Sequence, residues 1–218
     1  MSDLTITGRL RIGLFPSFMS AKDESGQMRG FAAGLGSVLA ERMGVGAELI
    51  EYRSPPDVVG ALNDLSCDVG LLGIEPSRAA TVSFTTPLIR AEFTFLVPDG
   101  SSVATVADAV TSSQRIAVVR NHAMDFALRG KAGSAELIYV DVPDEAFALI
   151  AAGTATVCAG IRPGLLAYAV ELPGSRVLSD CYGANEIALA VAKDRQQRLS
   201  WMQDFVNEAK SSGLARHL

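Results

Sequence analysis

Cysteine and histidine are scarce in this sequence of 218 residues, which contains three cysteines and two histidines. Cys67, Cys158 and Cys181 are too few and too scattered for a disulfide framework, and no CxxC pair is present. With so few ligands we expect no structural zinc site, and we predict no metal or other cofactor. Cys67 and Cys158 lie in or beside apolar runs, so both are expected to be small buried residues.

Clusters of positive charge and long apolar runs are also missing. The formal net charge is -5 and no block of lysine or arginine stands out, which disfavours nucleic acid as a partner. No run of 18 apolar residues occurs, so no membrane-spanning segment is expected. The opening MSDLTITGRLRIGLF lacks the basic and apolar regions of a secretory leader. We therefore expect a cytoplasmic protein if Met1 is the native start, and a periplasmic one if a leader has been removed.

Common catalytic signatures are absent as well. The sequence contains no GxSxG, GxGxxG or P-loop motif, and no arrangement of nucleophile, base and orienting residue can be read from it. What it does contain is a globular composition, with 49% apolar and 20% charged residues, enough for a large core.

Short apolar runs typical of buried strands alternate with segments of helical periodicity along almost the whole chain. The expected strands are residues 10–15, 47–52, 68–73, 91–98, 114–120, 135–141, 156–161 and 186–194. The expected helices include residues 31–43, 55–65, 103–110, 124–128, 144–153, 163–170 and 201–209. This alternation predicts βαβ units, and hence an α/β fold with mostly parallel sheets flanked by helices.

The two halves of the chain carry similar patterns, which predicts two lobes. Two long strand-like runs, near 91–98 and 184–194, are placed where the chain could cross between them. We expect lobe one to hold residues 1–92 plus 192–218, and lobe two to hold residues 96–184. Open α/β sheets bind ligands beyond the carboxyl ends of their strands, so a ligand cleft between the lobes is expected.

Five segments, in this order, resemble those of the type 2 periplasmic binding proteins, and most of all the family 3 solute-binding proteins of ABC transporters. They are GRLRIGLFPSF, DESGQMRGFAAGL, LNDLSCDVGLLGIEPSRAATVSFTTPL, RIAVVRNHA and DEAFALIAAGTATVCAGIRPGLLAYA. The resemblance covers nearly the whole chain. It implies a monomer whose two lobes close like a hinge on a small solute, with an ABC permease as partner.

The resemblance implies a specific role for Arg78, whose guanidinium group would bind the ligand's carboxylate with two parallel hydrogen bonds. A guanidinium group can donate two parallel hydrogen bonds to a carboxylate. The turn before it, from Gly73 through Ile74 and Glu75, is about two residues shorter than is usual in the family and lacks the usual threonines. The alternative is an arginine that caps a helix or pairs with Glu75.

Lobe two departs from the family at Ile161 and Arg162. Family members that bind α-amino acids place an acid here to meet the ammonium group, and this sequence has none. Two cations, Arg78 and Arg162, favour a carboxylate, a dicarboxylate or another anion as the ligand. Glu75 could still meet an amine, so amino acids remain open. The alternative for Arg162 is a surface side chain at a helix start.

The remaining expected ligand residues lie in two loops. Asn121, His122 and Ala123 occupy the place where the family holds a carboxylate with backbone N–H groups and a small hydroxyl residue. His122 replaces the hydroxyl, and could donate a hydrogen bond or simply face solvent. Phe15 and Phe18 lie in the first loop, where the family uses an aromatic ring to stack on the ligand. Phe18 fits that place better, and Phe15 could be a core residue.

Three functions agree with these features. The first is non-catalytic binding of a small anionic, carboxylate-bearing solute, as the substrate-binding component of an ABC-type transport system. The second is a cytoplasmic dehydratase of the cyclohexadienyl or chorismate type on the same fold, for which Glu75 and His122 are the candidate acid and base. The third is a sensory or regulatory lobe that works with a separate partner.

Overall fold

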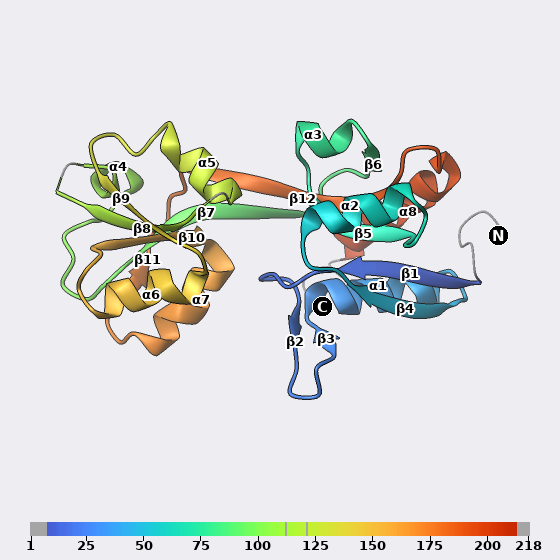
Figure 1. The fold of residues 1–218 in the computed structure, drawn as a ribbon, viewed down its shortest axis with the longest axis horizontal. Helices are drawn as coiled ribbons and strands as arrows, with labels where there is room; N and C mark the ends of the chain where they lie inside the picture. The colour runs from blue at the N-terminus through green and yellow to red at the C-terminus, as the bar shows by residue number, and fades with distance from the viewer. Residues whose placement is uncertain (1–7, 112, 121, 213–218) are drawn as a thin grey trace. The chain divides into compact units, whose positions relative to one another are not determined.

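The computed structural model describes residues 8–111, 113–120 and 122–212. The chain divides into two compact units (Figure 1). The first unit is Met1–Ile89 with Glu186–Leu218, and the second unit is Arg90–Asn185. Two strands, β7 (Ile89–Val97) and β12 (Gly183–Ala192), run from one unit into the other. Both units mix strands and helices, and each is described on its own below.

The first unit holds a sheet in the order β4-β1-β5-β12, with β6 also paired to β12. Its elements are β1 (Arg9–Leu14), β2 (Ala21–Lys22), β3 (Met28–Arg29), α1 (Phe31–Arg42), β4 (Gly46–Glu51), α2 (Pro55–Asn63), β5 (Val69–Gly73), α3 (Pro76–Ala79), β6 (Val82–Phe84) and α8 (Gln196–Ser212). β1 is parallel to β4 and β5 because helices α1 and α2 carry the chain back between them. β12 is antiparallel to β5 and β6.

The core of the first unit joins α2 to this sheet. Val58, Ala61 and Leu62 of α2 pack against buried residues that include Cys67 and Leu72. Cys67 is fully buried, as predicted. A small hairpin of β2 and β3 leads into α1 through Gly30, which has a φ of 104°. A Cβ atom there would lie 2.7 Å from the carbonyl oxygen of Met19, so glycine is required at this position.

The second unit holds a sheet in the order β7-β10-β8-β9, with β11 also paired to β7. Its other elements are α4 (Val106–Ala109), β8 (Arg115–Val119), α5 (Ala123–Arg129), β9 (Glu136–Val140), α6 (Pro143–Ala151), β10 (Val157–Ile161), α7 (Arg162–Glu171) and β11 (Arg176–Val177). β8 is parallel to β9 and β10, whereas β7 is antiparallel to β10 and β11.

Both faces of this second sheet are covered. Ile116 and Val118 of β8 belong to one apolar cluster, and Ala117 and Val119 belong to another. Successive side chains of a strand point to opposite faces, so the two clusters lie on the two sides of the sheet. Cys158 is buried in the second cluster, as predicted. A strand buried on both faces explains why residues 116–119 are apolar without alternation.

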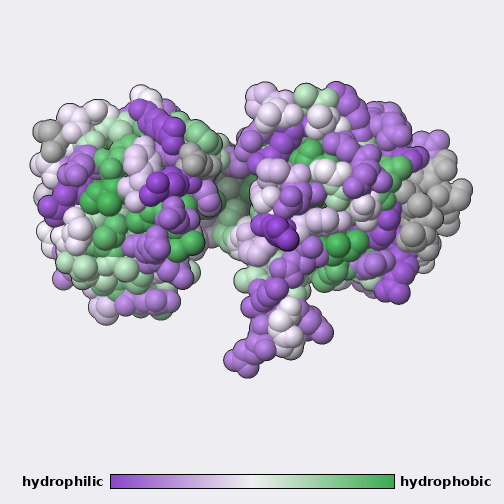
Figure 2. Space-filling view, viewed as in Figure 1, coloured by the Kyte–Doolittle hydropathy of each residue, from purple (hydrophilic) through white to green (hydrophobic). Residues whose placement is uncertain are grey.

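The surface of both units mixes polar and apolar residues on the face shown in Figure 2. Among the larger exposed apolar side chains, Phe126, Leu166 and Val170 all belong to the second unit. Within the described ranges, no helix has both the length and the apolar character needed to cross a membrane.

The expected α/β architecture is confirmed. Each unit has three parallel strands, β4-β1-β5 in the first and β10-β8-β9 in the second. Apart from the separate hairpin of β2 and β3, the antiparallel pairs involve β7 and β12, the strands that pass between units, and the short strands β6 and β11. Each sheet is therefore mixed, with a parallel part that matches the βαβ pattern.

Candidate functional site

The expected ligand residues of the first unit lie at one edge of its sheet. β1 and β5 are parallel neighbours, so the residues that follow them lie at the same carboxyl edge. Phe15 follows β1, and Ile74 and Glu75 follow β5. Phe15 is partly buried against the core around α2, whereas Phe18 is 40% exposed. Phe18 is thus the more available ring, and its stacking role stays a prediction.

Glu75 and Arg78 are held in fixed relation by the short helix α3. Glu75 has extended backbone angles, and Pro76 occupies the first helical position, which suits its restricted φ. The backbone N–H groups of Arg78 and Ala79 donate to the carbonyl oxygen of Glu75 at 3.0 and 2.9 Å. Residues three apart on a helical turn face the same side, so the two charged side chains meet.

The guanidinium group of Arg78 lies at the end of β5. Its Nη1 donates to the carbonyl oxygen of Gly73 at 3.0 Å, and its Nη2 lies 3.3 Å from Oε1 of Glu75. The side chain of Arg78 is 17% exposed and that of Glu75 is 38% exposed. Ile74 is fixed by a hydrogen bond from its N–H to the carbonyl oxygen of Glu186. The structure thus brings together Gly73, Ile74, Glu75 and Arg78.

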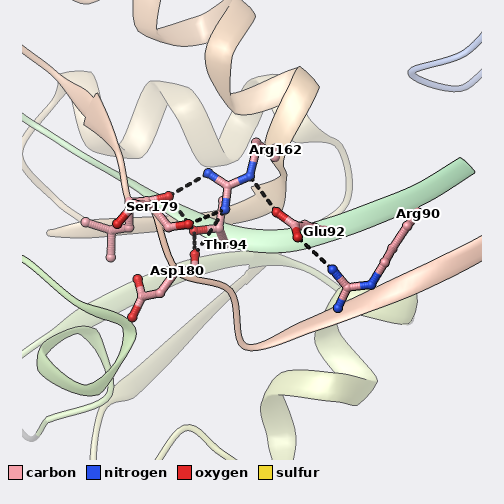
Figure 3. A network of polar contacts seen from close by, with 7 residues as sticks. Arg90, Glu92, Thr94, Arg162, Ser179 and Asp180 are labelled. Carbon is pink, nitrogen blue, oxygen red and sulfur yellow. Dashed lines mark hydrogen bonds and ion pairs between the residues drawn. The ribbon is translucent and has the colours of Figure 1, made fainter. Parts of the chain in front are cut away.

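Arg162, the first residue of α7, contacts four acceptors in the second unit (Figure 3). Its Nε donates to Oε2 of Glu92 at 2.9 Å, and its Nη1 donates to the carbonyl oxygen of Leu178 at 2.7 Å. Its Nη2 donates to the carbonyl oxygens of Ser179 and Asp180 at 2.9 and 3.2 Å. All three nitrogens of the guanidinium group therefore bind protein oxygens, in a side chain that is 24% exposed.

Glu92 links Arg162 to a second arginine. Arg90 donates from Nη1 to Oε1 of Glu92 at 2.7 Å (Figure 3). The hydrogen bond from Arg162 lowers the pKa of Glu92, and the positive charges of Arg162 and Arg90 act in the same direction. Glu92 is therefore ionised at neutral pH and carries the charge that balances Arg162.

These contacts change the expectation about ligand charge. That expectation rested on two arginines without an acid to balance them. In the structure Arg78 is paired with Glu75, and Arg162 is paired with Glu92. The cationic groups are thus already matched by carboxylates, and they give no reason to require a ligand of net negative charge.

The expected residues of the second unit also share a sheet edge. β8 and β10 are parallel neighbours, so His122 and Ala123 after β8 lie at the same edge as Ile161 and Arg162. His122 is exposed and precedes α5, where its carbonyl oxygen accepts from the N–H groups of Asp125 and Phe126. Asn121, which was also expected to contact the ligand, lies outside the described residues.

Sequence reasoning missed the partners of Arg162. Glu92 interrupts the apolar run of β7, and this lone acid in a strand was a signal that could have been read. The carbonyl oxygens of residues 178–180 carry no sequence signal, because every residue has one. Their approach to Arg162 depends on the path of the chain after β11.

The fold described above is that of the type 2 periplasmic binding proteins, as comparison with solved structures shows. A family model, "Bacterial extracellular solute-binding proteins, family 3", matches residues 10–218, and the chain belongs to this family. No curated protein matches the sequence.

Solved structures share the fold at low identity. One is a putative binding component of an ABC transporter from Wolinella succinogenes DSM 1740, complexed with lysine. It is 22% identical, with a TM-score of 0.84 over 97% of this chain and 94% of that one. An ancestral arginine-binding protein bound to arginine is 22% identical, with a TM-score of 0.75 and 96% of each chain covered. An ancestral amino acid-binding protein, described as a precursor of cyclohexadienyl dehydratase, is 24% identical. Its TM-score is 0.76, with 96% of this chain and 93% of that one covered.

Proposed function

We propose that this chain is the solute-binding component of an ABC-type transport system, and that Arg78 binds a carboxylate of its solute. The family supports the role and the permease partner. The observation that carries the residue assignment is the position of Arg78. Its guanidinium group is held at the carboxyl edge of the first sheet by the Gly73 carbonyl, where α/β sheets present their ligand residues.

The chemistry of the group suits this role. A guanidinium group has five N–H donors in a planar fork, and Nη1 of Arg78 is fixed by one carbonyl oxygen, so the fork is oriented before a solute arrives. Backbone N–H groups around His122 and Ala123 are the expected second donors, and Phe18 is the expected stacking ring. Participation of both units stays a prediction, as does the hinge near 91–98 and 184–194.

The proposed solute carries a carboxylate but need not be a net anion, since both arginines already have carboxylate partners. The relatives described above were solved with lysine and with arginine, and both of those ligands have a carboxylate. That agreement supports a carboxylate anchor in this chain without identifying its solute.

A dehydratase function has weaker support. Its two candidate groups are Glu75, which is paired with Arg78 in the first unit, and exposed His122 in the second. We therefore propose a binding role without turnover. A change in the ultraviolet absorbance of prephenate, arogenate or chorismate on incubation with micromolar protein would contradict it.

The test is a thermal-shift and calorimetry screen with amino acids, monocarboxylates, dicarboxylates, aromatic acids and phosphate. A solute that binds wild type should lose affinity in Arg78→Ala by about 10- to 150-fold, the equivalent of roughly 1.5–3 kcal/mol for hydrogen bonds to a charged group. Arg53→Ala, which removes an exposed arginine of the same unit, is the matched control. Unchanged affinity in Arg78→Ala would refute the assignment.

A further inference from the structure

Glu75 stands at the candidate site with its carboxylate next to the proposed anchor. Its Oε1 lies 3.3 Å from Nη2 of Arg78, and α3 fixes the two residues on one side of a single turn. Any solute carboxylate that reaches Arg78 therefore also enters the field of Glu75. The negative charge of Glu75 therefore influences which solutes bind.

The Glu75–Arg78 contact is not a closed bidentate pair. One oxygen of Glu75 approaches one nitrogen of Arg78, while Nη1 of Arg78 is directed to the Gly73 carbonyl. Glu75 is also the more exposed of the two side chains. Its carboxylate therefore leaves room for a solute carboxylate on Arg78, and is itself placed to contact that solute.

The pair presents opposite charges at close range, and this favours one kind of solute. A simple carboxylate would gain from Arg78 but would be repelled by Glu75. A solute with an ammonium group next to its carboxylate would be attracted by both residues. In an α-amino acid these two groups are separated by a single carbon atom, which matches the short spacing of the charges in the pair.

We infer that Glu75 is a selectivity residue, which pairs with a cationic group of the solute next to the carboxylate held by Arg78, and disfavours solutes that are carboxylates only. The inference rests on the proposed function, since it needs Arg78 as anchor. Glu75 would supply the acid from the first unit. In the second unit, the position where the family is expected to carry an acid holds Ile161 and Arg162, and Arg162 is paired with Glu92.

The experiment uses probe pairs that differ only in the α-ammonium group: L-lysine with 6-aminohexanoate, L-arginine with 5-guanidinopentanoate, and L-glutamine with glutaramate. Affinities are measured by calorimetry for wild type, Glu75→Gln, Arg78→Ala and Glu92→Gln. The last variant is the matched control, because it removes the carboxylate of the other arginine pair. Circular dichroism and the melting temperature without solute show whether each variant is folded.

For at least one pair, wild type should prefer the amino acid by about tenfold or more, as expected for a charged hydrogen bond. Glu75→Gln should bring that ratio close to one, with the affinity for the desamino probe unchanged or higher, whereas Glu92→Gln should keep the wild-type ratio. An unchanged ratio in Glu75→Gln, or a wild-type preference for the desamino probe, overturns the inference. Affinity that survives Arg78→Ala refutes the anchor instead, and binding of none of the pairs by wild type overturns both.

Discussion

Two arginines that follow buried strands use their guanidinium groups in different ways. Arg162 binds Glu92 and three backbone carbonyl oxygens, whereas Arg78 contacts one carbonyl oxygen and one carboxylate. An arginine whose nitrogens are all used by the protein stabilises that part of the chain. An arginine with fewer protein contacts, held at a sheet edge, has donors to offer a solute.

This difference predicts that Arg162→Ala acts on stability rather than on solute binding. The change removes one of the two arginine partners of Glu92 and leaves three carbonyl oxygens without this donor, so the free energy of unfolding should fall by roughly 1–3 kcal/mol. Urea unfolding without solute is the measurement. Arg78→Ala is the counterpart, with little expected effect on unfolding and a large one on solute affinity. A loss of affinity in Arg162→Ala equal to that in Arg78→Ala would contradict the assignment.

The pH dependence of the same variant gives an independent readout. Arg162 lowers the pKa of Glu92 in the folded protein, so the pair contributes stability above the ordinary pKa of a glutamate. That contribution is lost as the pH falls through the lowered pKa and Glu92 takes up a proton. The stability gap between wild type and Arg162→Ala should therefore be largest near neutral pH and should shrink in acid. A gap that stays constant would show that Arg162 acts through packing and its hydrogen bonds to backbone carbonyl oxygens, and not through Glu92.

At the scale of elements, a buried ionic cluster ties together three parts of the first unit. Asp68, which has no exposed surface, precedes β5 and binds Arg11 of β1 through Nε at 3.0 Å and Nη2 at 3.1 Å. It also lies 3.2 Å from Nη1 of Arg198, a buried residue of α8. Burial lowers the pKa of Arg198, and the charge of Asp68 opposes that shift. Asp68 thus offsets the cost of burying Arg198.

Asp68→Ala should therefore be strongly destabilising, by about 3–5 kcal/mol, because it leaves a buried arginine without its counter-ion. Urea unfolding tests this, with Glu41→Ala on the exposed face of α1 as the control. Adding Arg198→Met to Asp68→Ala should recover part of the loss, since the unpaired charge is then removed. A double variant as unstable as the sum of the single variants would contradict this account.

Elements differ in how far the sequence predicts them. The parallel strands and their helices follow from apolar periodicity, so β1, β4, β5, β8, β9 and β10 lie close to their expected positions. Helix α3 and strands β6 and β11 have four, three and two residues, too few to produce a period. The same limit applies to the site. Glu75 and Arg78 are near in sequence, so the sequence indicates that they could pair. Glu92 is 70 residues from Arg162, and only the fold brings these two together.

At the scale of the whole molecule, each unit has an apolar core built from its own residues. The chain passes between the units along β7 and β12. A solute held by Arg78 alone would stabilise the first unit directly. A solute held also by groups near His122 would stabilise both. The two cases can be told apart without knowing how the units are placed relative to one another.

We predict that the solute slows amide hydrogen exchange in both units. At a hundredfold excess over its Kd, a solute stabilises the binding-competent state by about 2.7 kcal/mol, which would slow exchange through global opening up to about 100-fold. Mass spectrometry should show this effect around residues 73–79 and 122–128, and Arg78→Ala should lose it in both segments at the same solute concentration. Protection confined to residues 73–79 would show that the first unit binds the solute by itself, and the ligand roles predicted for His122 and Ala123 would then be wrong.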